Sequence, residues 1–163
     1  MNYQISFHRR LVLAAVLIAG SASSALADDP SNVQGSFSGY GVGAIEGGTL
    51  VASDSGWGTA SQIGQFTFTM LQTVNLATSN GSGGFVLAFS NGDKLYGSLS
   101  GAADPSDPAH IVLSLAIAGG TGRFRDATGT LTFDRHSDFS TLPAFESNYG
   151  TVTGAISTPG PAK

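Results

Sequence analysis

Apolar and polar residues alternate along most of this chain with a period of two, which predicts β-strands rather than helices. The clearest case runs from Gln65 to Leu76, where Phe66, Phe68 and Met70 share one face and threonines take the other. Gln72 falls on the apolar face, so one polar side chain is expected to point inward. Less regular alternation predicts further strands over residues 35–45, 49–53, 84–90, 94–101, 110–118, 130–139 and 149–156.

Short polar turns separate these segments. Asn91-Gly92-Asp93 is a hairpin signal, and Asp104 to Pro108 contains two prolines, which predicts a loop at one end of the fold. About eight antiparallel strands with such connections predict an all-β domain, either a single eight-stranded antiparallel barrel of calycin-like type or a sandwich. A closed barrel removes exposed edges, and eight strands enclose room for side chains or one small ligand.

The N-terminal segment has the pattern of a signal peptide. Arg9 and Arg10 precede an apolar run over 11–20, and Ala25-Leu26-Ala27 supplies the small residues of a cleavage site. We therefore expect a signal peptide over 1–27, a linker over 28–34, a barrel domain over 35–156 and a tail over 157–163. The product would be exported, periplasmic or secreted, with no membrane span after cleavage; the Sec and twin-arginine routes both remain open.

Composition excludes several classes of function. The chain has no cysteine, so disulfides, cysteine nucleophiles and thiolate metal sites are absent. Without Arg9 and Arg10, five basic residues face eleven acidic ones, a net charge of −6. No basic cluster remains to offset phosphates, which argues against nucleic-acid binding.

The most distinctive motif is a glycine-rich reversal between two predicted strands. It is predicted to be a structural turn whose large aromatic residue plugs the interior, and its members are Gly119, Gly120, Gly122, Phe124 and Gly129. A phosphate-binding loop is rejected, because no Lys-Ser/Thr pair and no helix N-terminus follow.

This motif resembles the barrel superfamily of plant allene oxide cyclases and dirigent proteins, in its exported bacterial form. The matching pattern, Gly-Gly-Thr-Gly-x-Phe-x-x-Ala-x-Gly, spans residues 119–129, and segments 58–66, 91–97 and 111–118 are also similar. The resemblance implies an eight-stranded barrel with an apolar cavity and no cofactor. Plant members cyclise an unsaturated fatty-acid epoxide or steer the radical coupling of phenols, and they form trimers, so a homo-oligomer is an expectation too.

Arg135 is the most interesting candidate for a site. It keeps phase with Leu131 and Phe133, so it should point inward unless a bulge or the barrel rim places it in water. A buried guanidinium needs a partner, and Glu146, Asp93 or an anionic ligand such as a fatty acid could supply it. The full set of cavity candidates is Phe66, Phe68, Met70, Gln72, Arg135 and Tyr149.

Two other constellations are weaker. Asp134, His136 and Asp138 share a strand face and could hold a metal, but alternate residues lie about 7 Å apart and oppose the apolar face. A solvated outer surface is the preferred interpretation, and no metal or cofactor site is expected. Trp57 is expected in a turn at one barrel end. A Ser-His-Asp hydrolase would lack the usual Gly-x-Ser-x-Gly elbow.

Three functions are compatible with this sequence. The barrel could bind a small apolar or amphipathic molecule, which we favour, or be a structural protein filled by its own side chains. It could instead be a cofactor-free cyclase or isomerase that confines a reactive substrate. The sequence does not decide whether the protein is an enzyme, and it assigns no catalytic residue.

Overall fold

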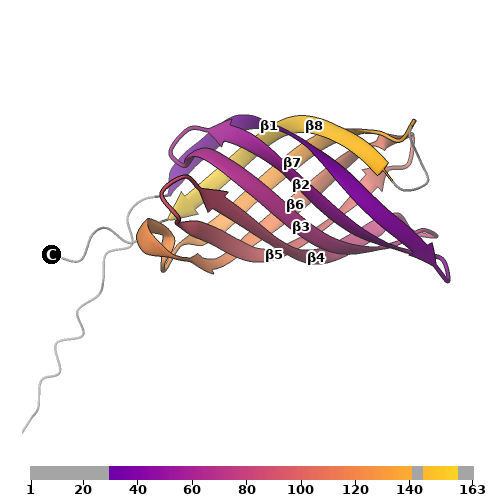
Figure 1. The fold of residues 1–163 in the computed structure, drawn as a ribbon, viewed down its shortest axis with the longest axis horizontal. Helices are drawn as coiled ribbons and strands as arrows, with labels where there is room; N and C mark the ends of the chain where they lie inside the picture. The colour runs from indigo at the N-terminus through magenta and orange to yellow at the C-terminus, as the bar shows by residue number, and fades with distance from the viewer. Residues whose placement is uncertain (1–29, 141–144, 158–163) are drawn as a thin grey trace, which may run out of the picture.

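The described residues form a closed antiparallel barrel in which eight strands follow one another in sequence order (Figure 1). The computed structural model describes residues 30–140 and 145–157. Ser31 pairs with Ile156, so β1 and β8 close the barrel. The strands are β1 Ser31–Glu46, β2 Thr49–Ala60, β3 Gly64–Asn75, β4 Asn80–Phe89, β5 Lys94–Asp104, β6 Asp107–Gly120, β7 Thr128–Asp138 and β8 Phe145–Ser157. This confirms the predicted all-β, eight-stranded barrel.

Several strands are longer than the sequence predicted. β1 begins at Ser31 rather than Gly35, because the predicted linker residues 31–34 pair with β8. β2 extends to Ala60, which places Trp57 inside a strand rather than in a turn. The inward positions of β2 include Gly56 and Gly58, so the strand lacks the apolar alternation that marks β3. The predicted loop at Asp104–Pro108 also shrinks, since only Pro105 and Ser106 separate β5 from β6.

The predicted signal peptide, residues 1–27, and residues 158–163 of the predicted tail lie outside the described residues. Among the residues that are described, no helix has the length and hydrophobicity needed to cross a membrane.

Aromatic rings fill the middle of the barrel. Phe37 of β1 stacks on Phe133 of β7 with ring centroids 4.4 Å apart. Phe68 of β3 meets both rings edge-on, at 5.7 and 5.8 Å. The period-two face of β3 is buried as predicted, and Leu71 on its other face is 62% exposed. Part of the interior is therefore solid core, as the filled-barrel hypothesis expected.

The glycine-rich reversal closes one barrel end. It contains a single turn of 3-10 helix, η1 Gly122–Phe124, a helical turn that the sequence did not predict (orange, Figure 1). Phe124 is 1% exposed and packs on Phe89 with ring centroids 4.7 Å apart, which confirms its place as an inward plug. Arg123 covers the plug, with its guanidinium 4.4 Å from the Phe124 ring centre and a 2.6 Å hydrogen bond to the Ile63 carbonyl.

Gly119 and Gly120 end β6, Gly122 opens η1, and Gly129 lies in β7. The side chain of Asp93 occupies the space beside Gly122, where a Cβ would overlap its carboxylate. Gly122 also has a φ of +56°, a conformation that favours glycine. The motif therefore has the structural role that the sequence predicted.

Candidate functional site

A cavity of about 390 Å³ lies inside the opposite end of the barrel, toward the β1–β2, β3–β4 and β5–β6 turns. Its wall is largely apolar and includes Leu50, Val74, Ile111, Leu113 and Phe139. A concave, mostly apolar space with few polar groups is the usual form of a small-molecule site. The barrel is thus solid at the η1 end and hollow at the other.

Four polar side chains, which we call the polar cluster, meet at the inner end of this cavity: Asp54, Gln72, Arg135 and Glu146. Arg135 Nη1 donates a 3.0 Å hydrogen bond to Asp54 Oδ1, and Gln72 Nε2 donates a 2.8 Å bond to Asp54 Oδ2. Arg135 Nη2 lies 3.5 Å from Glu146 Oε1. The Asp54 and Arg135 side chains are only 1% and 6% exposed, so this is a buried charge network.

Four different strands supply the polar cluster. Asp54 lies on β2, Gln72 on β3, Arg135 on β7 and Glu146 on β8. Because alternate strand residues face the same side, Gln72 follows Met70 inward and Arg135 follows Phe133. Gln72 and Arg135 therefore each lie one inward step nearer the cavity than the last core residue of their strands.

A glycine on β1 makes room for the two carboxylates. A Cβ at Gly41 would lie 2.5 Å from Asp54 Oδ1 and 2.9 Å from Glu146 Oε1. Such distances are far shorter than van der Waals contact, so a side chain here would displace the polar cluster. Gly41 therefore belongs to the architecture of the site although it has no functional group.

Glu146 is a largely buried carboxyl group beside Arg135 and Asp54. Burial raises its pKa from 4.5 to about 7, with Asp54 adding to the rise and Arg135 opposing it. Asn148 Nδ2 lies 3.4 Å from Glu146 Oε1 and donates a long hydrogen bond to it. A carboxyl group with this pKa exchanges a proton near neutral pH, which suits it to donate or accept one.

Three buried polar atoms near the polar cluster have no hydrogen-bond partner within residues 30–140 and 145–157: Arg135 Nε, Ser137 Oγ and Asn148 Oδ1. Ser137 and Asn148 are register partners on β7 and β8. A buried polar atom without a partner costs about 1–3 kcal/mol. Water or a ligand hydroxyl in contact with these atoms would remove that cost.

The predicted site residues divide into three groups. Gln72 and Arg135 lie in the polar cluster, so the structure brings these two together as the pattern suggested. Phe66, Phe68 and Met70 are buried in the aromatic core rather than on the cavity wall. Tyr149 was wrongly expected in the cavity: it is 62% exposed on the outer face, because Asn148 takes the inward position of β8.

The sequence missed Asp54 as a site residue. The predicted second strand ended at Ser53, one residue short, since the glycine-rich remainder of β2 gave no alternation. Glu146 was named as a partner of Arg135, and the contact of 3.5 Å agrees with that. Asp93, the other residue named, accepts a 3.3 Å hydrogen bond from the Arg123 amide at the η1 end instead.

The acidic and imidazole groups of β7 lie on the outer face. Asp134, His136 and Asp138 are exposed, as expected. Asp134 Oδ1 lies 2.8 Å from His110 Nε2 of β6, and the His110 and His136 rings stack at 4.9 Å. The described segments contain no group of three side chains that could hold a metal ion.

Comparison with known proteins supports the fold. No protein-family model and no curated protein matches the sequence. Solved structures do match, among them the pterocarpan synthase dirigent protein, with a TM-score of 0.53 and 20% sequence identity over 83% of this chain and 90% of that one. This chain therefore has a dirigent-like barrel, which confirms the fold that the resemblance in its sequence implied; at this identity the likeness extends to the fold alone.

Proposed function

We propose that the barrel cavity binds a small amphipathic molecule, with its apolar body on the cavity wall and a neutral hydroxyl or carbonyl group on the polar cluster. The observation that carries this proposal is a buried, hydrogen-bonded charge network at the inner end of an otherwise apolar cavity of about 390 Å³. In such a site, apolar contacts with the cavity wall supply the affinity for the ligand, and a few polar groups fix its orientation.

Charge balance favours a neutral polar group over a carboxylate. Arg135 already contacts Asp54 at 3.0 Å and Glu146 at 3.5 Å. The net charge of Arg135, Asp54 and Glu146 together is zero when Glu146 is protonated and −1 when Glu146 is ionised. A carboxylate ligand would add a further negative charge in a medium of low dielectric constant. We therefore replace the fatty-acid hypothesis suggested by the sequence with an uncharged ligand.

A matched pair of ligands tests this directly. Binding of 1-decanol and decanoate is measured by displacement of the neutral dye N-phenyl-1-naphthylamine at pH 8, where Glu146 is mostly ionised. We expect the alcohol to bind more tightly than the acid of equal chain length. Decanoate binding as tightly as the alcohol would contradict the neutral-group assignment.

Variants locate the binding site. Ala52 lines the cavity, so Ala52→Phe should fill it and abolish dye binding. Ala116 is exposed on the outer face of β6, and Ala116→Phe adds the same ring without touching the interior. Dye binding that survives Ala52→Phe would place the ligand elsewhere. Native mass spectrometry of protein purified from its own host then identifies the natural ligand as a co-purifying mass.

A second candidate function is a cofactor-free cyclase or isomerase. The observation that favours it is Glu146, whose pKa of about 7 suits proton transfer beside a confined substrate. A solved protein with this fold is a pterocarpan synthase, so such a barrel can house a synthase. In this function Glu146 moves the proton, while Arg135 and Gln72 hold Asp54 in place.

Metabolite profiling separates the two functions. Host extract is incubated with wild-type protein and with Glu146→Gln, and the products are compared by mass spectrometry. A cyclase or isomerase depletes a metabolite in the wild-type sample alone, with a rate that changes near pH 7. A simple binder leaves the extract unchanged while still retaining a ligand.

A further inference from the structure

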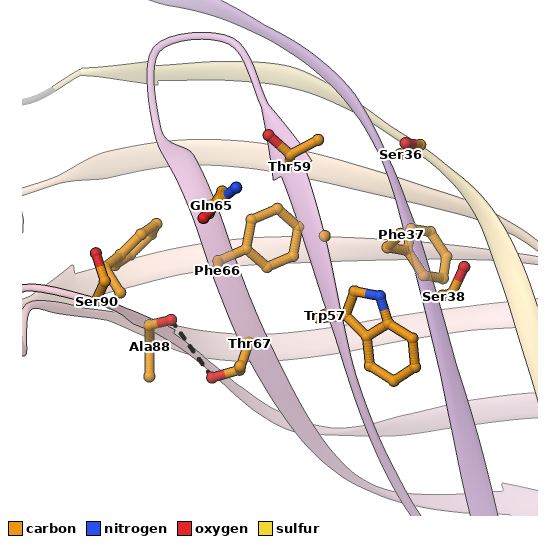
Figure 2. A pocket seen from close by; sticks show the side chains of 12 residues that line it. Ser36, Phe37, Ser38, Trp57, Thr59, Gln65, Phe66, Thr67, Ala88 and Ser90 are labelled. Carbon is orange, nitrogen blue, oxygen red and sulfur yellow. Dashed lines mark hydrogen bonds between the residues drawn. The ribbon is translucent and has the colours of Figure 1, made fainter.

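The outer face of β1 to β4 carries an open groove of about 610 Å³ beside Trp57. Trp57 is the single tryptophan of the chain and is 60% exposed. Figure 2 shows its indole ring beside β2 on the side of β1, close to Ser38, with the ring face turned outward. Gly58, the next residue, has no side chain, so the rings of Phe37 and Phe66 form part of the groove floor.

The rest of the groove lining is polar and uncharged. Thr67 Oγ1 donates a long 3.4 Å hydrogen bond to the Ala88 carbonyl, drawn dashed in Figure 2. The other polar side chains of the lining make no hydrogen bond within the described part of the chain, and thus face water with their donors and acceptors available. The polar lining residues are Ser36, Ser38, Thr59, Gln65, Thr67 and Ser90.

A second exposed aromatic residue extends this surface. Ser38 of β1 is the register partner of Trp57 on β2 and of Tyr149 on β8. Trp57 and Tyr149 therefore flank one small serine, about two strand spacings or roughly 10 Å apart. Tyr149 is 62% exposed and stacks on His136 at 6.0 Å, which orients its ring.

We propose that the Trp57 groove and Tyr149 form a binding face for an extended, neutral oligosaccharide. A pyranose ring presents a C–H face that stacks on an aromatic ring, and its hydroxyl groups can bond to the serine, threonine and glutamine side chains at the rim. Two aromatic rings separated by a serine suit a ligand that covers more than one sugar unit.

The lining argues against other occupants. A fully apolar ligand would bury these polar side chains, of which only Thr67 has a hydrogen-bond partner within the described residues, and this is unfavourable. A polyanion such as nucleic acid or an acidic polysaccharide would meet no cation in the groove lining. This face lies outside the barrel, so the proposal is independent of the ligand in the cavity.

Trp57 itself reports on occupancy, because it is the only indole in the chain. The full chain is titrated with cellohexaose, chitohexaose and maltohexaose, with hexagalacturonate as the charged comparison. We expect a saturable shift in Trp57 fluorescence and protection from acrylamide quenching with at least one neutral hexasaccharide, and none with hexagalacturonate. No response to any neutral hexasaccharide at millimolar concentration overturns the proposal.

Isothermal titration calorimetry of variants tests the geometry. Trp57→Ala and Tyr149→Ala should each weaken binding roughly tenfold, the effect of losing one aromatic stack, and Trp57→Phe should retain part of it. Tyr40→Ala is the control, since Tyr40 is 47% exposed on β1 but does not line the groove. Wild-type affinity in Trp57→Ala or Tyr149→Ala overturns the proposal. A shift in Trp57 fluorescence when the protein concentration is raised without sugar would also overturn the proposal, because a second copy of the chain would then occupy the binding face.

Discussion

Arg135 Nη1 donates a 3.0 Å hydrogen bond to Asp54 Oδ1 across the barrel interior. The two residues are 81 positions apart, and they join β7 to β2, which are not neighbours in the barrel. Both side chains are almost fully buried. A ligand that enters the cavity therefore meets an ion pair that is already formed, not a lone cation.

Replacing one member of this ion pair should lower the stability of the fold strongly, whereas replacing both members with apolar residues should lower it much less. Arg135→Met leaves Asp54 buried without its cation, beside Gln72 and the Glu146 carboxyl group, and we expect the free energy of unfolding in urea to fall by about 3–5 kcal/mol. The double variant Arg135→Met/Asp54→Leu replaces both charges with apolar groups and should recover most of that loss. If the double variant is less stable than the single one, the charges do not compensate each other as described.

The stability of the protein should depend on pH through Glu146. Its pKa is about 7 when folded and 4.5 as an isolated group, so between these values the folded state keeps a proton that the unfolded state releases. The free energy of unfolding should fall by at most about 3 kcal/mol as pH rises from about 4.5 to 7, and it should then level off.

Chemical denaturation at several pH values checks this. Glu146→Gln cannot ionise and should remove this part of the slope, whereas Glu46→Gln changes an exposed residue and should not. Equal slopes for wild type and Glu146→Gln would mean that burial does not raise the pKa.

Gly41 should tolerate no side chain. Gly41→Ala places a Cβ 2.5 Å from Asp54 Oδ1, and such overpacking typically costs about 1–3 kcal/mol. Gly84→Ala is the matched control, because the nearest atom to its Cβ, the Gly97 carbonyl oxygen, is 3.6 Å away. Thermal unfolding compares the two; a Gly41→Ala protein as stable as Gly84→Ala would show that the polar cluster can move aside.

The η1 plug should matter for stability and not for cavity binding. Phe124→Ala removes a fully buried ring and is expected to cost about 3–5 kcal/mol. Arg123→Ala should cost less, through the lost ring contacts and the hydrogen bond to Ile63, while Arg125→Ala on the exposed surface should change little. Urea unfolding ranks the three variants by their loss of stability. A larger loss for Arg125→Ala than for Arg123→Ala would contradict this prediction.

Export remains a prediction from the N-terminal pattern. Cleavage after Ala27 would leave Asp28 as the first residue. N-terminal sequencing of the protein isolated from the periplasm or the culture medium of its host should read Asp-Asp-Pro-Ser. Recovery of the intact chain from the cytoplasm alone would count against a signal peptide.

Strands with large apolar residues on their inward face could be predicted from the sequence, and strands with inward glycines could not. β3 carries Phe66, Phe68 and Met70 inward, so its period-two pattern was unmistakable. β2 carries Gly56 and Gly58 inward, because the Phe68 and Phe66 rings occupy the space that their side chains would fill. Because rings from β3 fill the space beneath these glycines, β2 shows no alternation of apolar and polar residues. For this reason the sequence did not predict Asp54 as an inward residue or Trp57 as part of a strand.

Eight antiparallel strands, the inward phase of Gln72 and Arg135, and the plug at Phe124 could all be predicted from the sequence, because each follows from alternation or from local turn chemistry. The contacts of Arg135 with both Asp54 and Glu146, and the outward position of Tyr149 beside Ser38, became known only from the three-dimensional fold. Strand register and barrel closure set these contacts between distant residues. A shift of one residue would exchange the inner and outer faces of a strand.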